Sequence, residues 1–89
     1  MLEKNICISN KLGLHARASM LLINTAGRFN SSIKIISNSQ TVDAKDILSV
    51  MSLAASQGTS ITIQVSGDDE TAALEAITQL IDNKFGEDE

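Results

Sequence analysis

The 89-residue chain has no proline, tryptophan or tyrosine, and only one cysteine, one histidine and two phenylalanines. A lone cysteine, Cys7, excludes an internal disulfide, and its alternating apolar segment predicts a buried, structural thiol. With so few aromatic side chains and a formal net charge of −4, the chain lacks the stacking surface and the positive patch that bind nucleic acid. We therefore predict no nucleic-acid partner.

Long apolar runs are absent too. No stretch approaches the roughly 20 apolar residues that cross a bilayer. Residues 1–9 have neither the basic start nor the apolar core of a signal peptide. The expectation is a cytoplasmic protein without membrane insertion. No linker or repeat divides the chain, so we expect a single domain over residues 1–89.

Acidic residues concentrate at one end of the chain. Residues 1–67 carry six Lys or Arg against three Asp or Glu, whereas residues 68–89 carry one against eight. We interpret the acidic segment as a solvated helix face followed by a frayed tail.

Four segments show the two-residue alternation of half-buried strands. They are residues 2–8, 31–37, 40–44 and 59–66. In the first of them, Leu2, Ile6 and Ile8 share one face. Asn38-Ser39 predicts a hairpin turn between the second and third segments, although serine is a poorer second turn residue than glycine.

Three other segments, within residues 16–29, 46–54 and 68–86, repeat apolar residues every three or four positions and predict helices. Asp46 is well suited to cap the second of them. The resulting order is β-α-β-β-α-β-α. Strands that are apolar on one face only predict an α+β fold, an open-faced β-sandwich in which three helices cover one face of a four-stranded antiparallel sheet.

The residue counts remove several kinds of chemistry. One histidine and one cysteine cannot supply the three or four ligands of a zinc site, so we predict no metal. No GxSxG nucleophile motif or GxxxxGK phosphate loop occurs, and His15 has no partner for a catalytic triad. What remains is His15 acting as a nucleophile itself.

His15 stands where a strand ends and a helix begins, just after Gly13, which permits a tight turn. At the helix N-cap, it would leave the amides of Ala16, Arg17 and Ala18 as donors for an anion such as phosphate. The Arg17 guanidinium can pair with two phosphate oxygens at once. These residues fit a histidine that accepts and releases a phosphoryl group, but they also fit an incidental cap in a small binding module.

The motifs "NKLGLHARAS" (residues 10–19) and "VDAKDILSVMSLAASQGTSITI" (residues 42–63) resemble the HPr family, the phosphocarriers of the bacterial phosphotransferase system, including its nitrogen-related members. The resemblance covers the whole chain. It implies that His15 accepts phosphate on Nδ1 from phospho-enzyme I and passes it to an enzyme IIA protein, while Arg17 steadies the phosphoryl group. It describes a carrier with a phosphohistidine intermediate rather than a stand-alone enzyme, and it implies no cofactor.

Two functional branches stay open at this point, sugar uptake and nitrogen-related regulation, and so does the acceptor enzyme IIA. The sequence "HARAS" (residues 15–19) and the acidic end "FGEDE" (residues 85–89) slightly favour the regulatory branch. An alternative from another class is an interaction domain that keeps the fold without transferring phosphate. Intact His15 and Arg17 argue against it.

The chain departs from the family pattern at three positions. Ala18 replaces a proline of the first helical turn, which should preserve the site, and Ser39 replaces a turn glycine. Asp46 stands where members controlled by HPr kinase carry serine. The carboxylate either simply preserves the helix cap or partly imitates a phosphorylated serine and weakens enzyme I binding.

A docking surface is expected around His15, because this region holds more apolar groups than one small core absorbs. Its predicted members are Ala16, Met20, Ile47, Leu48, Met51 and Lys45. For Met20 and Met51 a core role is an equal alternative. Exposed together and surrounded by Lys11, Arg17 and Lys45, they would form a patch for enzyme I, enzyme IIA and other regulatory proteins in turn. We expect a monomer.

Overall fold

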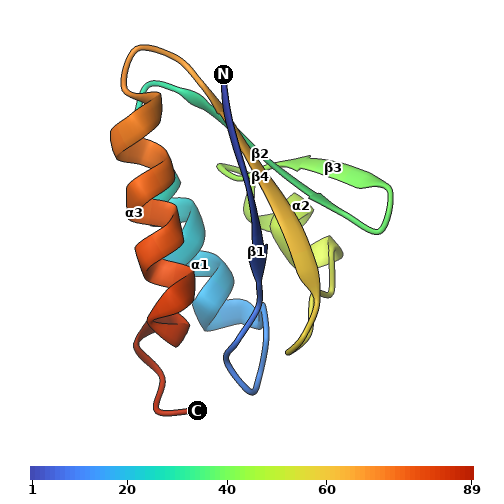
Figure 1. The fold of residues 1–89 in the computed structure, drawn as a ribbon. Helices are drawn as coiled ribbons and strands as arrows, with labels where there is room; N and C mark the ends of the chain where they lie inside the picture. The colour runs from blue at the N-terminus through green and yellow to red at the C-terminus, as the bar shows by residue number, and fades with distance from the viewer.

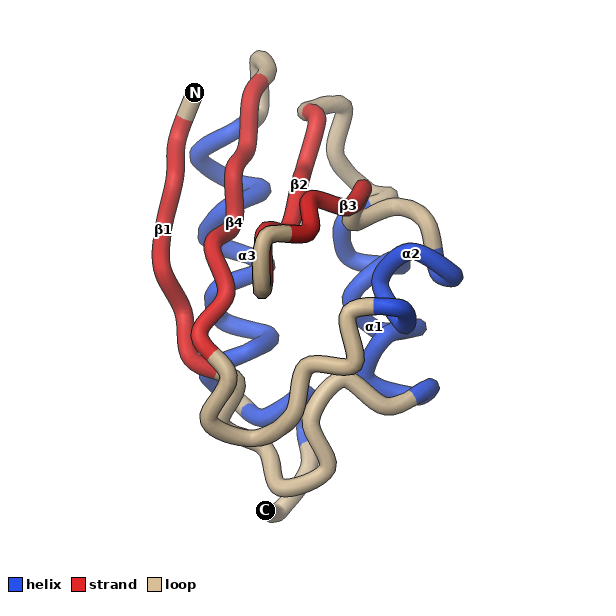
Figure 2. The backbone as a smooth tube through the Cα atoms, turned by 90° about the vertical axis from the view of Figure 1, so that its right-hand side faces the viewer, coloured by secondary structure: helices blue, strands red, loops and turns tan.

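The computed structural model describes all 89 residues. The strands and helices are β1 (Leu2–Cys7), α1 (Ala16–Ala26), β2 (Ser32–Ser37), β3 (Gln40–Asp43), α2 (Ile47–Ser52), β4 (Ser60–Ser66) and α3 (Glu70–Asp82), followed by a 3₁₀ turn, η1 (Lys84–Gly86). Figures 1 and 2 show the helices together on one side of the sheet. The order and the layers confirm the predicted open-faced sandwich. None of the helices is both long enough and apolar enough to span a membrane.

The sheet has the strand order β1-β4-β2-β3, and every neighbouring pair is antiparallel. Its inner face carries the apolar half of each alternation, with Ile6 opposite Ile61 and Ile35 opposite Ile63. These side chains are buried under the helices. The open face is polar: the Thr62 hydroxyl donates to Asn5 Oδ1 at 2.7 Å, and the Gln64 amide donates to Glu3 Oε1 at 2.7 Å.

The predicted burial of Cys7 is wrong. The thiol is exposed, because the alternation that turns Ile6 into the core turns Cys7 onto the open face. The apolar character of the segment suggested burial, whereas the position in the alternation decides it.

The hairpin between β2 and β3 is confirmed. Asn38 and Ser39 both adopt left-handed backbone angles, with φ of 50° and 69°. Two consecutive positive φ values form the tight turn whose twist matches that of antiparallel strands. Ser39 therefore occupies a conformation that glycine adopts at lower cost.

The chain end is not a frayed tail. The α3 helix stops at Asp82, earlier than the apolar repeat predicts, and Lys84, Phe85 and Gly86 then take φ values of 56°, 55° and 76°. This left-handed turn places Phe85 in the core. The last residues therefore run back toward the start of α1, where the Lys11 amide donates to a main-chain oxygen of Glu89 at 2.9 Å.

Candidate functional site

His15 is the N-cap of α1, as predicted, with an extended backbone (φ −75°, ψ −179°). The preceding loop is tightly fixed. Gly13 has a φ of +66°, and a Cβ there would lie 2.5 Å from the Ala55 carbonyl oxygen, so only glycine fits. The Leu14 amide donates to that same oxygen at 2.8 Å, and the Asn10 side-chain amide donates to the Gly13 carbonyl at 2.8 Å.

The ring of His15 caps the helix through Nδ1, which accepts from the Arg17 amide at 3.2 Å. Only a nitrogen with a free lone pair can accept, so these hydrogen bonds assign the ring tautomer that carries its proton on Nε2. The amides of Ala16 and Ala18 donate to no acceptor in the protein. Of the three amides predicted to bind an anion, two are therefore free and the third faces Nδ1.

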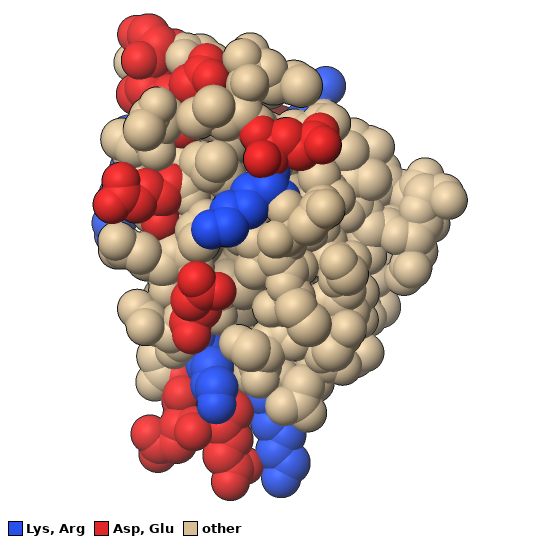
Figure 3. Space-filling view, in the orientation of Figure 1, with Lys and Arg blue, Asp and Glu red and all other residues tan.

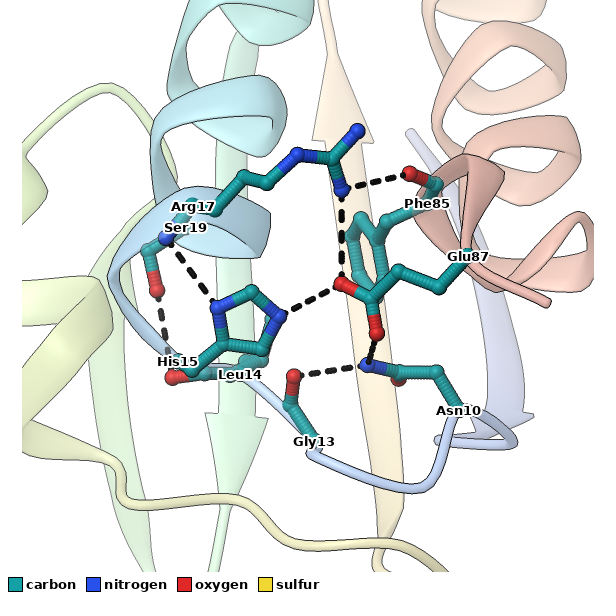
Figure 4. Close-up of polar contacts among 8 residues, drawn as sticks. All are labelled: Asn10, Gly13, Leu14, His15, Arg17, Ser19, Phe85 and Glu87. Carbon is teal, nitrogen blue, oxygen red and sulfur yellow. Dashed lines mark hydrogen bonds and ion pairs between the residues drawn. The ribbon is translucent and has the colours of Figure 1, made fainter. Parts of the chain in front are cut away.

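The other ring nitrogen meets a carboxylate that the sequence analysis did not single out. His15 Nε2 lies 2.5 Å from Glu87 Oε2, and the Asn10 side-chain amide donates to Glu87 Oε1 at 3.0 Å. Arg17 Nη1 donates to Glu87 Oε2 at 3.4 Å and to the Phe85 carbonyl at 3.2 Å. Figure 4 shows the carboxylate facing all three side chains, His15, Arg17 and Asn10.

The pKa of Glu87 is held below its ordinary value of 4.5. The hydrogen bond from Asn10 lowers it most and the hydrogen bond from His15 comes next, partial burial opposes them, and the positive charge of Arg17 adds a smaller lowering. Glu87 is thus an anion at neutral pH. The site combines one imidazole, one guanidinium and one carboxylate.

Most of the apolar side chains that were predicted to form a docking surface are exposed to solvent. Met20 of α1 is 47% exposed, and Leu48 and Met51 of α2 are 77% and 41% exposed. Ala16 is exposed and Ile47 half-buried. The core alternative for Met20 and Met51 is therefore wrong. Leu12, in the loop before His15, is a further exposed apolar residue that the prediction omitted.

The charge around this apolar surface is less positive than predicted, because two of the three basic residues expected there are paired with carboxylates. Lys11 pairs with Glu89 at 3.4 Å and Arg17 with Glu87. Figure 3 shows acidic and basic groups side by side at the end of the molecule where the chain terminates. Lys45 lies at the opposite end of α1 from His15, since its ammonium donates to the Phe29 carbonyl at 2.8 Å.

Glu87 and Asn10 were missed because neither belongs to a local motif. The acidic run at residues 87–89 is typical of a solvated terminus, and only the fold brings it to His15. Phe85, a large apolar residue just past the last helical repeat, is the one signal that could have indicated an anchored end.

A family model described as the PTS HPr component phosphorylation site matches residues 2–83. The chain belongs to the HPr family. Accordingly, it is a phosphocarrier of the phosphotransferase system. The phosphocarrier protein HPr of Cupriavidus necator is 49% identical over 89 residues, covering all of both chains.

Solved structures agree with this assignment. The crystal structure of HPr-C-His from Thermoanaerobacter tengcongensis is similar over the full length of both chains, with a TM-score of 0.97 and 44% identity. A crystal structure of an HPr dimer from the same organism matches with a TM-score of 0.79 and 45% identity, over 98% of this chain and 100% of that one. The HPr fold thus occurs in a dimeric form among the relatives.

Proposed function

We propose that His15 is the phosphoryl acceptor, that its donor is phospho-enzyme I and that its acceptor is an enzyme IIA protein. The observation that carries the proposal is the position of Nδ1. It holds a lone pair at the N-terminus of α1, beside a helix amide that already points at it. Helix N-termini bind phosphate through such amides.

Transfer needs only the groups at this site. The Nδ1 lone pair forms a bond to phosphorus while the bond from phosphorus to the donor atom of enzyme I breaks, and the electron pair of that bond returns to the donor. The phosphoryl oxygens then accept from the amides of Ala16, Arg17 and Ala18 and from the exposed Arg17 guanidinium. Transfer to enzyme IIA reverses the first step, and the electron pair returns to Nδ1.

The exposed apolar side chains of α1 and α2 are the proposed docking surface. Ala16, Met20, Ile47, Leu48 and Met51 form it, with Lys45 at its margin. Flexible methionines suit a surface that several partners use in turn. We also propose that residues 1–89 act as one domain, as a monomer in the cytoplasm. Sedimentation that shows a dimer at working concentration would contradict the last proposal.

The experiment is phosphorylation with enzyme I, magnesium and labelled phosphoenolpyruvate. The wild-type chain is expected to take up label that is acid-labile and base-stable, whereas His15→Ala takes up none. No label on the wild type would favour the interaction domain that lacks transfer, and undiminished label on His15→Ala would show that His15 is not the acceptor. Presenting the labelled chain to purified enzyme IIA proteins of the sugar and nitrogen branches then identifies the acceptor.

A further inference from the structure

Glu87 is the one carboxylate that contacts both proposed transfer residues, and the fold holds it there from three sides. Asn10 Nδ2, His15 Nε2 and Arg17 Nη1 all approach its two oxygens. Asn10 is itself fully buried, and its amide also donates to Gly13 in the loop that sets His15. The carboxylate is therefore tied to the same loop as the ring that it contacts.

The chain on either side of Glu87 is anchored as well. Phe85, two residues before it, is buried in the core, and its carbonyl accepts from Arg17. Glu89, two residues after it, pairs with Lys11 through its side chain and its main chain. Glu87 is fixed between two anchors rather than carried on a free end.

We propose that Glu87 is a positioning residue for phosphoryl transfer, whose carboxylate keeps the proton of His15 on Nε2 and the lone pair on Nδ1. The proposal rests on His15 being the acceptor. A carboxylate only accepts hydrogen bonds, so it selects the ring tautomer that donates from Nε2. A carboxylate that orients the far nitrogen of a catalytic imidazole serves the same purpose in hydrolytic triads.

The carboxylate also matches the charge that transfer creates. The neutral ring uses its Nδ1 lone pair to bind phosphorus and loses no proton, so the imidazole becomes a cation while Nε2 keeps its hydrogen. Glu87 then lies against a positive N–H donor, and this charge-assisted hydrogen bond is stronger than the one to the neutral ring. When the phosphoryl group leaves, the positive charge disappears with the N–P bond.

The test compares Glu87→Gln and Glu87→Asp with a matched control at the exposed neighbour, Asp88→Asn. Two donors are used: phospho-enzyme I, and phosphoramidate, a small molecule that needs no docking surface and releases ammonia as its P–N bond breaks. We expect Glu87→Gln to accept phosphate about tenfold more slowly from both donors, the scale of one charge-assisted hydrogen bond. Glu87→Asp should recover part of the rate, and Asp88→Asn should match the wild type.

Nitrogen-15 NMR of the His15 ring gives a readout that a purely structural role would not change. The wild type should show a single tautomer with its proton on Nε2. Glu87→Gln should show both tautomers, because a glutamine amide can donate to Nε2 as well as accept from it.

Three results of the rate measurements would overturn the proposal while leaving His15 as the acceptor: unchanged rates in Glu87→Gln, a faster rate, or a slower rate with enzyme I alone. The faster rate would mean that Glu87 blocks the site, and the last result would mean that it acts in docking. A lowered urea midpoint with an unchanged tautomer would also overturn it. Absence of label on wild-type His15 would instead contradict the proposed function itself.

Discussion

At the scale of single residues, the proposed phosphate site uses an exposed side chain and free backbone amides rather than core side chains. The Arg17 side chain is 59% exposed and reaches only the Phe85 carbonyl and the Glu87 carboxylate. Ala18, where the family pattern has proline, is fully buried, and its amide is free. The substitution therefore adds a donor to the site without disturbing the packing of α1.

Arg17→Ala should slow phosphoryl transfer while leaving the fold intact. Its guanidinium is the only cationic side chain that contacts the cluster of His15 and Glu87, and loss of one charged donor to a transferring group costs about tenfold or more in rate. The free energy of unfolding should change by no more than about 0.5 kcal/mol, as is usual at exposed positions. Labelled transfer assays and urea unfolding measure the two effects. Arg28→Ala, another exposed arginine, is the control, and an unfolded Arg17→Ala would show that the side chain supports the core.

At the scale of elements, helix ends determine what each helix does. His15 caps α1 with a ring nitrogen, whereas Asp46 caps α2 with Oδ1, which accepts from the amides of Leu48 and Ser49 at 3.1 and 3.4 Å. The cap is the observed role of Asp46, and serine forms the same kind of cap. If Asp46 also imitates phosphoserine permanently, its carboxylate must weaken enzyme I binding in addition to capping α2.

Asp46→Ser should therefore leave both stability and the rate of transfer from enzyme I unchanged, whereas Asp46→Ala should lower stability by about 1 kcal/mol because the cap is lost. Thermal unfolding and the labelled transfer assay test the pair. Faster transfer to Asp46→Ser than to the wild type would favour the phosphoserine interpretation, since removing the carboxylate would then improve enzyme I binding.

At the scale of the whole molecule, the sequence predicted what repeats locally and missed what only the fold assembles. Strand alternation, helix repeats and the capping roles of His15 and Asp46 follow from neighbours a few residues apart. The contact between His15 and Glu87 joins residues 72 positions apart. It depends on a left-handed turn at Lys84 and Phe85, residues that seldom adopt this conformation, so no local rule predicts it.

A second long-range contact makes stability depend on pH. Asp69 accepts from the amides of Asn30 and Ser31 at 2.8 and 2.9 Å and from the Ser31 hydroxyl, so it ties the loop after α1 to the start of α3. Gly67 beside it packs too closely on Ser31 to admit a Cβ. The Ser31 hydroxyl first, and the Asn30 amide next, hold the pKa of Asp69 below its ordinary value of 3.8.

The direction of the effect follows from the lowered pKa. The unfolded chain binds a proton at Asp69 more readily than the folded chain, so this contribution to stability is complete above the ordinary value of 3.8 and is lost as the pH falls through the lower folded value. Asp69→Asn should reduce the urea midpoint at neutral pH, and the difference from the wild type should shrink below pH 3.8. Asp68→Asn, at an exposed neighbour, is the control. A difference that stays constant down to the acid limit would show that the amide geometry, and not the charge of Asp69, holds the two loops together.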